Sequence, residues 1–256
     1  MQISNTIKIN KADFINNCPK IKAKVHSIET FGAVDGPGIR FILFLQGCHL
    51  RCLYCHNPDS WELNAGNELS LKSILKNIMA YKKFYKNGGV TISGGEPLIQ
   101  HQFLFEFLSA LEVLGFHSAI DTNGFIDLKY SKKCIDKANM LLLDMKEVDE
   151  NDCITLTEHS NTNMLKTLQY CQSVNKCVWI RYVCVPNYTL KDEKLHKLGK
   201  MIKNYSCVEK IDLIPFHQLG AYKYKELNIK YKLESTPTPS NEDMNNARAI
   251  LKEYGF

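Results

Sequence analysis

The stretch Met140-Leu141-Leu142-Leu143-Asp144 places four apolar residues in a row directly before a carboxylate. An apolar run without alternation is typical of a parallel strand that is covered on both faces of its sheet. Each strand-like run is followed by a segment of helical length. The expected strands are residues 39–46, 90–93, 117–121, 140–145, 178–185 and 208–215, and the expected helices are residues 70–86, 100–114, 128–138, 161–175, 190–205 and 241–254. Repeated right-handed crossovers curl such units, so the sequence predicts an α/β fold, a partial (β/α)6 barrel.

Length and composition fit one enzyme-sized domain. The chain has 256 residues, of which 45% are hydrophobic and 23% are charged, enough to bury a substantial core. We expect residues 1–21 to form an N-terminal extension, loosely attached over residues 1–19, and residues 22–256 to form the domain. Residues 20–29 are expected to add an edge strand.

Charge and cysteine usage exclude several classes of protein. The net charge of +5 is spread along helical segments, which argues against a nucleic-acid partner. No apolar run approaches about 18 residues, and no apolar region follows Lys8 and Lys11, so neither a membrane span nor a signal peptide is expected. Seven of the ten cysteines are scattered singly, which suits a reducing compartment. The sequence predicts a cytoplasmic protein.

The cysteine loop, residues 47–57, carries the most specific pattern. Cys48, Cys52 and Cys55 are separated by three and then two residues. Three thiolates can hold a four-iron cluster and leave one iron without a protein ligand, where chemistry can occur. A ferredoxin-type run would have two-residue gaps throughout and a fourth cysteine before proline. The alternative is a closed zinc site that His49 or His56 completes.

Unusual residues also follow the carboxyl ends of the other expected strands. Ser93 to Pro97 ends the second strand, Asp121 to Gly124 the third and Asp144 to Lys146 the fourth, while Arg181 lies in the fifth and His217 just past the sixth. These positions converge on the rim where barrels of this type carry active sites.

Each of these motifs also has a structural interpretation. Gly94-Gly95 allows backbone to approach a ligand closely, and Glu96 suits a ligand ammonium group, but two glycines also make an ordinary turn. Asp144 and Lys146 lie two apart and suit a ribose or carboxylate clamp. The alternative is an exposed ion pair worth under about 1 kcal/mol. A lone histidine such as His217 is more often a core or surface residue whose hydrogen bonds are satisfied. The alternative role of Arg181 is only to neutralise a carboxylate at the rim.

The spacing of the cysteines, with Tyr54 before the last, resembles the signature of radical S-adenosylmethionine enzymes. A wider set of motifs resembles the family of pyruvate formate-lyase activating enzymes over roughly residues 22–256. The motifs that carry this resemblance are residues 35–41, 47–57, 93–96, 121–124, 143–146, 179–182 and 214–217. Pro97 departs from the alanine that is frequent in this family, which weakens the assignment of the target more than that of the chemistry.

The resemblance implies a role for each matching position. Cys48, Cys52 and Cys55 would bind a catalytic 4Fe-4S cluster, and Asp121, Thr122 and Asp144 would hold a monovalent cation. The partner's glycine loop would meet Asp35, His56 and Arg181, although residues 35–38 alone also fit a plain surface loop. S-adenosylmethionine would be surrounded by Tyr54, His56, Asn57, Gly94, Gly95, Glu96, Asp121, Asp144, Met145, Lys146 and His217.

The implied activity is reductive cleavage of S-adenosylmethionine to a 5′-deoxyadenosyl radical, which takes a hydrogen atom from a glycine of pyruvate formate-lyase. No cysteine lies between Cys55 and Cys134, so one cluster is expected. Flavodoxin or ferredoxin would donate the electron, and the chain would be a monomer. Three alternatives stay open: an activase of another glycyl radical enzyme, a radical synthase for a small molecule, and a metal-binding module without turnover.

Overall fold

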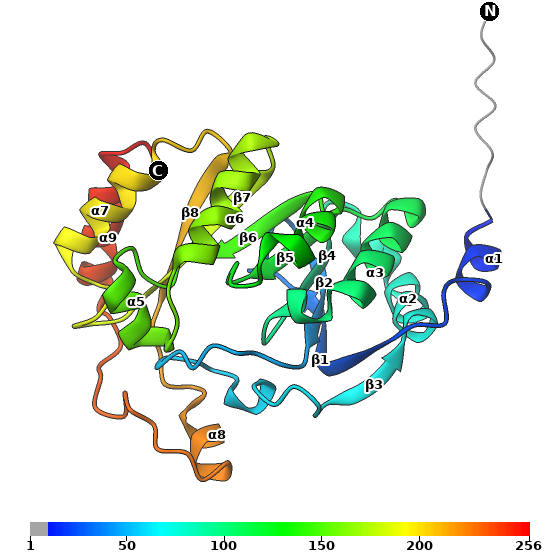
Figure 1. Ribbon diagram of the computed structural model, residues 1–256, viewed down its shortest axis with the longest axis horizontal. Helices are drawn as coiled ribbons and strands as arrows, with labels where there is room; N and C mark the ends of the chain where they lie inside the picture. The colour runs from blue at the N-terminus through cyan, green and yellow to red at the C-terminus, as the bar shows by residue number, and fades with distance from the viewer. Residues whose placement is uncertain (1–9) are drawn as a thin grey trace, which may run out of the picture.

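A curved sheet of eight strands forms the centre of the computed structural model, which describes residues 10–256 (Figure 1). The strand order is β3-β1-β2-β4-β5-β6-β7-β8. Six neighbouring strands pair in parallel, namely β2, β4, β5, β6, β7 and β8. Strand β1 is antiparallel to both of its neighbours, β3 and β2. The strands are β1 (Lys22–Gly32), β2 (Arg40–Leu45), β3 (Asn67–Ser70), β4 (Gly89–Gly94), β5 (Ser118–Thr122), β6 (Met140–Asp144), β7 (Cys177–Cys184) and β8 (Val208–Pro215).

The predicted partial (β/α)6 barrel is confirmed. Its six parallel strands and the helices between them lie where the sequence places them, and the sheet ends at β3 and β8 without closing. The α-helices are α1 (Lys11–Asn16), α2 (Leu71–Ala80), α3 (His101–Leu114), α4 (Leu128–Lys137), α5 (Glu150–Thr157), α6 (Thr162–Ser173), α7 (Asp192–Ile202), α8 (Ala221–Glu226) and α9 (Asn241–Lys252). Short 3-10 helices are η1 (Pro58–Ser60), η2 (Lys82–Tyr85) and η3 (Pro97–Gln100).

The helix boundaries follow local capping chemistry. Ser70 accepts a hydrogen bond from the Ser73 amide and begins α2, and Ser240 with Asp243 forms a capping box at α9. Gly115 has φ +74° and ends α3, since glycine adopts this backbone conformation without a steric penalty.

The predicted edge position of residues 20–29 is wrong. These residues do form a strand, β1, but β3 pairs with its outer side. β3 has only four residues, none of them fully buried, so the sequence offers no strong strand pattern there. Helices α1, α5 and α8, of six, eight and six residues, were also not predicted from the sequence.

The N-terminal segment touches the domain within the described residues. Ile15 of α1 is buried in the same apolar cluster as β2 and β4, and Lys11 Nζ donates to Leu114 O at 2.6 Å. Residues 1–9 of the expected extension lie outside the described residues, and the division at residue 21 stays a prediction.

Two apolar clusters fix the sheet against its helices. One packs α2 and α3 against β2, β4 and β5, and the other packs α6, α7 and α9 against β6, β7 and β8. A third cluster joins the cysteine loop to Leu156 of α5, Phe216 and Leu233. The loop is therefore part of a packed region, and its shape is set by side chains that are distant in sequence. Within residues 10–256, no helix has the length and apolar character needed to cross a membrane.

Candidate active site

The cysteine loop has a fixed course between β2 and η1. The Cys48 amide donates to Trp61 O at 3.1 Å, and the Leu53 amide donates to Leu156 O at 2.9 Å. Arg51 Nη1 donates to Cys48 O at 2.8 Å from within the loop. These bonds satisfy backbone groups that a buried irregular segment would otherwise leave unpaired.

An inner cavity of about 370 Å³ lies beside this loop, at the carboxyl ends of the parallel strands. All three cysteines of the loop line it, so the three thiols face one space. Fourteen of the predicted site residues line the inner cavity: Asp35, Cys48, Cys52, Tyr54, Cys55, His56, Asn57, Gly94, Gly95, Asp121, Asp144, Lys146, Arg181 and His217.

Gly94 and Gly95 let the end of β4 pass against the cysteine loop. Gly94 has φ +134°, and a Cβ atom there would lie 2.1 Å from Leu45 O. A Cβ atom on Gly95 would lie 2.3 Å from Gly47 O and 3.0 Å from Cys48 Cβ. Any side chain here would displace backbone, so the glycines are required by the contact between two chain segments as well as by the open cavity wall.

The Asp144–Lys146 pair lies at the end of β6 and is mostly buried. Lys146 Nζ lies 2.7 Å from Asp144 Oδ2, and the side chains are 16% and 23% exposed. Burial alone would lower the pKa of Lys146, but the neighbouring Asp144 carboxylate holds it well above its ordinary value. The interpretation as an exposed surface pair is excluded, and the cavity wall carries a fixed ammonium group.

Arg181 joins two carboxylates across the sheet. Its Nη1 lies 3.0 Å from Asp121 Oδ2 and 3.1 Å from Asp35 Oδ1. The Asp121 carboxylate raises the pKa of Arg181, whereas burial raises the pKa of Asp121 despite that partner. Within residues 10–256, Asp121 Oδ1 and Arg181 Nε are buried atoms without a hydrogen-bond partner. Such atoms are rare, and both lie in residues of the cavity wall.

The Asp35 loop is held in place by a fully buried arginine. Arg40 donates to Val90 O at 2.8 Å and to Pro37 O at 3.1 Å, and Thr91 Oγ1 donates to Asp35 O at 2.6 Å. Burial lowers the pKa of Arg40 to about 10. Residues 35–38 are therefore anchored by buried hydrogen bonds, and Asp35 lines the cavity.

His56 and His217 form a stacked pair, with ring centroids 3.9 Å apart. His56 Nε2 lies 2.8 Å from His217 O, and burial lowers the pKa of His56. A Cβ atom on Gly220 would lie 2.7 Å from His56 Cα, so the segment before α8 packs directly on this part of the cysteine loop. Next to it, Lys223 donates to Asn57 Oδ1 at 2.9 Å.

Three predicted site residues lie behind the cavity wall. Glu96 is 1% exposed and accepts hydrogen bonds from the Leu98 amide, Thr122 Oγ1 and the Asn123 amide. Burial raises the pKa of Glu96 to about 7. Met145 is fully buried in the apolar cluster beneath β6. In this structure Glu96, Thr122 and Met145 support the wall and do not line it.

Several residues of the wall were missed by sequence reasoning. Phe44, Val183 and Ile214 lie on strands β2, β7 and β8 and contribute apolar surface, as do Val34, Leu50 and Trp61. Ser60 and Ser93 add two hydroxyl groups. An apolar residue within a strand carries no sign in the sequence of which face of a curved sheet it occupies. Usable signals did exist for several of these residues, because Leu50, Ser93 and Ile214 lie within the motifs 47–57, 93–96 and 214–217, and Val34 directly precedes the motif 35–41.

The thiols of the cysteine loop are poorly ionised on their own. Burial raises the pKa of Cys48 to about 12 and also raises those of Cys52 and Cys55. Thiolate ligands therefore need the charge of a bound metal group to deprotonate them. Among residues 10–256, no three His, Cys, Asp or Glu side chains are grouped to hold a single metal ion. The zinc alternative therefore gains no support from the described residues.

The chain is similar to known proteins over most of its length. Residues 34–172 match the family described as "4Fe-4S single cluster domain". The "Pyruvate formate-lyase-activating enzyme" of Staphylococcus epidermidis is 42% identical over 244 residues, covering 92% of this chain and 97% of that protein. The "Pyruvate formate-lyase 1-activating enzyme" of Escherichia coli is 38% identical over 237 residues, covering 91% of this chain and 96% of that protein.

A solved structure supports the fold. A domain of pyruvate-formate lyase-activating enzyme from Bacteroides vulgatus superposes with a TM-score of 0.56 at 24% identity, covering 66% of this chain and 96% of that domain. At this identity the likeness concerns the fold alone.

Proposed function

The chain belongs to the family of pyruvate formate-lyase activating enzymes, and we propose that its inner cavity is where pyruvate formate-lyase is activated. The enzyme uses a 4Fe-4S cluster and S-adenosylmethionine to form a glycyl radical on that protein substrate. The observation that carries the proposal is the convergence of three thiols, a fixed ammonium group and a glycine-lined wall on one cavity.

The residues present fit a cluster held by three cysteines. Cys48, Cys52 and Cys55 lie on one loop with a fixed backbone and line the same cavity. Asn123 Nδ2 lies 4.0 Å from Cys48 Sγ and is placed to donate to the ligand sulfur. Hydrogen bonds to sulfur and exclusion of water are the means by which a protein tunes a cluster.

We assign the binding of S-adenosylmethionine to the polar wall beside the cluster site. Lys146 offers an ammonium group to a carboxylate, and Asp144 offers an acceptor to ribose hydroxyls or an amino group. Among residues 10–256, Tyr54 OH is buried without a hydrogen-bond partner, and the Tyr54 ring lies 5.6 Å from Lys146 Nζ. We infer that Gly94, Gly95, Asn57, His56 and His217 complete this wall and that Glu96 and Met145 act from behind it.

When bound, the cluster supplies one electron and an open iron, and S-adenosylmethionine supplies the radical that takes a hydrogen atom from glycine. The chain itself holds the reactants in register and keeps water away. Phe44, Val183 and Ile214 give the cavity an apolar lining, and the packed cysteine loop closes its side. Such positioning and exclusion of water are the protein's part in cofactor chemistry.

The partner's glycine loop is proposed to meet Asp35, Arg181 and His56. Asp35 and Arg181 form a fixed charge pair at the cavity, with a carboxylate and a guanidinium available to backbone amides and carbonyls. Beside Asp35, Val34 lines the cavity and is 74% exposed, so it is accessible to a protein partner.

Four further predictions are part of this proposal. A monovalent cation at Asp121, Thr122 and Asp144 is supported by Asp121 Oδ1, which is buried and has no hydrogen-bond partner among the described residues. Thr122 Oγ1 donates to Glu96 and Asp144 pairs with Lys146, so cation binding would need these contacts to loosen. We also expect a flavodoxin or ferredoxin as electron donor, a monomeric state and a cytoplasmic location.

The test is anaerobic electron paramagnetic resonance of iron-reconstituted protein with S-adenosylmethionine, a reductant and pyruvate formate-lyase. A glycyl radical doublet is expected, and Cys52→Ala should lose cluster iron and release no 5′-deoxyadenosine. The matched control is Cys177→Ala, which changes a cysteine outside the loop. It should keep its cluster iron and still release 5′-deoxyadenosine. Full turnover by Cys52→Ala contradicts the cluster assignment. Release of 5′-deoxyadenosine without a glycyl radical would favour another glycyl radical enzyme or a small-molecule substrate.

A further inference from the structure

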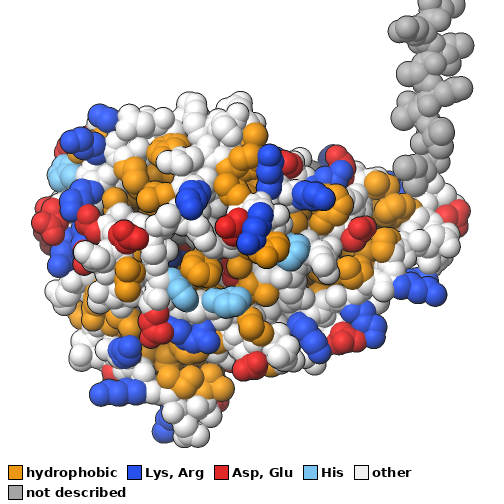
Figure 2. All heavy atoms as spheres, in the orientation of Figure 1, with side chains coloured by type: hydrophobic (Ala, Val, Ile, Leu, Met, Phe, Trp, Pro, Cys, Tyr) orange, Lys and Arg blue, Asp and Glu red, His pale blue; other side chains and the backbone are white. Residues whose placement is uncertain are grey.

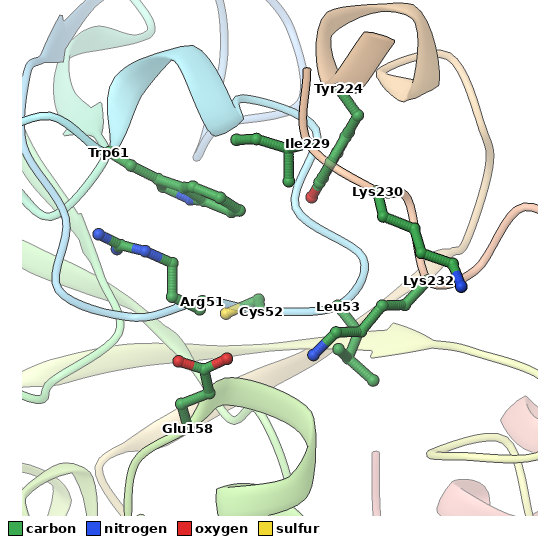
Figure 3. Close-up of a pocket in the computed structure, with 9 residues that line it drawn as sticks. All are labelled: Arg51, Cys52, Leu53, Trp61, Glu158, Tyr224, Ile229, Lys230 and Lys232. Carbon is green, nitrogen blue, oxygen red and sulfur yellow. The ribbon is translucent and has the colours of Figure 1, made fainter. Parts of the chain in front are cut away.

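A second pocket, of about 310 Å³, shares Cys52 and Trp61 with the inner cavity but is otherwise lined by different residues (Figure 3). We call it the outer pocket. Its walls come from the cysteine loop, from Glu158 after α5, and from α8 with the segment that follows it. Cys52 therefore forms part of a thin wall between the two spaces.

The proposed function requires an electron to reach the cluster by a route that leaves the inner cavity free. S-adenosylmethionine and the partner's glycine loop would occupy that cavity. Electron transfer slows steeply with distance, so an efficient route passes through a cluster ligand that approaches the surface elsewhere. Cys52 lines the outer pocket as well as the inner cavity and meets this requirement.

The outer pocket is electropositive. Arg51, Lys230 and Lys232 line it, against one carboxylate, that of Glu158. Figure 3 shows Lys230 and Lys232 on the wall opposite Trp61, and both lysines are exposed. Figure 2 shows Lys and Arg side chains bordering hydrophobic side chains on the face around α8. A charged rim around apolar surface is typical of a site for a protein of opposite charge.

The guanidinium group of Arg51 binds the cysteine loop. Its Nη1 donates to Cys48 O and to Leu50 O, at 2.8 and 3.0 Å, and its guanidinium lies 4.8 Å from the centre of the Trp61 ring. Arg51 thus fixes the loop and adds positive charge beside it. Lys230 and Lys232 are the cations of this pocket that face solvent for a partner.

The frame of the outer pocket is rigid before any partner arrives. Gln218 Nε2 donates to Glu234 O at 2.9 Å and to Thr236 O at 2.8 Å, which ties the two ends of the segment 218–236 together. Tyr224 OH donates to Cys55 O at 3.0 Å and so attaches α8 to the cysteine loop. A preformed site loses little conformational entropy on binding.

We propose that the outer pocket is the docking site of an acidic one-electron carrier protein, and that the electron enters through Cys52. This inference rests on the proposed function and names its electron-entry face. The carrier is oxidised by one electron and the protein-bound cluster is reduced by one electron. No bond forms or breaks, and no proton moves in this step.

The first test is the affinity of the reconstituted enzyme for a flavodoxin, used as an acidic carrier. The variant Lys230→Glu/Lys232→Glu should have a Kd for flavodoxin about tenfold or more above that of wild type at low ionic strength. Added salt should reduce this difference between variant and wild type. The matched control is Lys76→Glu/Lys133→Glu, which makes the same charge change at exposed positions on α2 and α4 and should leave Kd unchanged. Equal affinities of the two variants overturn the docking site.

A second test separates docking from chemistry. With dithionite, a small reductant that needs no protein docking, Lys230→Glu/Lys232→Glu should release 5′-deoxyadenosine at the control's rate. With reduced flavodoxin the same variant should be slower than the control. Equal rates with flavodoxin overturn the proposed entry face, whereas failure of the wild type with dithionite overturns the proposed function itself. Lys230→Gln/Lys232→Gln repeats the comparison with a milder change if the first variant folds poorly.

Discussion

Two buried lysine–carboxylate pairs include residues at or just after the carboxyl end of β6, and of the two only Asp144–Lys146 lines the inner cavity. Lys146 Nζ lies 2.7 Å from Asp144 Oδ2, and Lys194 Nζ of α7 lies 2.6 Å from Glu147 Oε2. Side chains of the second pair are 6% and 1% exposed, against 16% and 23% for the first. By burial alone, the Lys194 pair would be the stronger candidate for a perturbed functional site.

The difference lies in what surrounds each pair. Lys194 is saturated by a second carboxylate, Asp152, at 2.6 Å and borders a hollow of about 80 Å³. Lys146 borders a cavity of about 370 Å³ that the cysteine loop also lines. A buried ion pair therefore marks a site only where space and further chemical groups adjoin it, and otherwise it fastens a helix to the sheet.

The largest effect on stability is expected from Lys194→Met. The variant leaves the Glu147 carboxylate buried without its partner, which typically costs about 3 to 5 kcal/mol of unfolding free energy. At this chain length the midpoint of thermal unfolding should fall by about 10 °C. Affinity for S-adenosylmethionine, measured well below the midpoint, should be little changed. A large loss of affinity for S-adenosylmethionine without a loss of stability would contradict this prediction, because it would give the Lys194 pair the binding role that we assign to the Lys146 pair.

Removing both partners should recover most of that stability. In Glu147→Gln/Lys194→Met no buried charge is left unpaired, so unfolding free energy should return to within about 1 to 2 kcal/mol of wild type. Chemical denaturation of the single and double variants measures this directly. If the double variant is no more stable than Lys194→Met, packing of the lysine stem, and not its charge, is the main contribution.

Lys146→Met is expected to act on ligand binding as well as on folding, because it removes a cation from the cavity wall and also leaves the less deeply buried Asp144 carboxylate without its partner. Losing one charge-assisted hydrogen bond, worth about 1.5 to 3 kcal/mol, should raise Kd for S-adenosylmethionine by about 10- to 150-fold. Calorimetric titration of the reconstituted protein gives this value, and Lys146→Arg is the control that keeps the charge. An unchanged Kd in Lys146→Met would remove this residue from the proposed binding wall.

The smallest effect is expected from Asp152→Asn. The Asp152 side chain is 52% exposed, so its pair with Lys194 should contribute under about 1 kcal/mol. The Lys194 hydrogen bond lowers the pKa of Asp152 below its usual 3.8. This contribution is present above the ordinary pKa and is lost as pH falls through the lower folded value. The unfolding free energies of the variant and of wild type should therefore begin to approach each other near the ordinary pKa of 3.8 and become equal only as pH falls through the lower folded value.

The sequence by itself determined the architecture and the identity of the chemistry. Long apolar runs such as Met140 to Leu143 fix parallel strands, because only a sheet covered on both faces hides them. The cysteine spacing and the residues after each strand predicted a common rim, and fourteen of the predicted residues do line one cavity. Short elements such as β3 and α8 were not predictable, since four to six residues give too little periodic signal.

The tertiary structure alone decided which side of the wall each residue occupies. Glu96 and Met145 come from motifs that predict ligand contact, yet side chains from Thr122 and the core enclose them. Lys230 and Lys232 lie more than 170 positions beyond Cys52 in the chain, and only the packing of the α8 segment on the cysteine loop brings them to the same pocket. Sequence patterns report local periodicity and chemical type, whereas cavities arise from contacts between segments that no local pattern encodes.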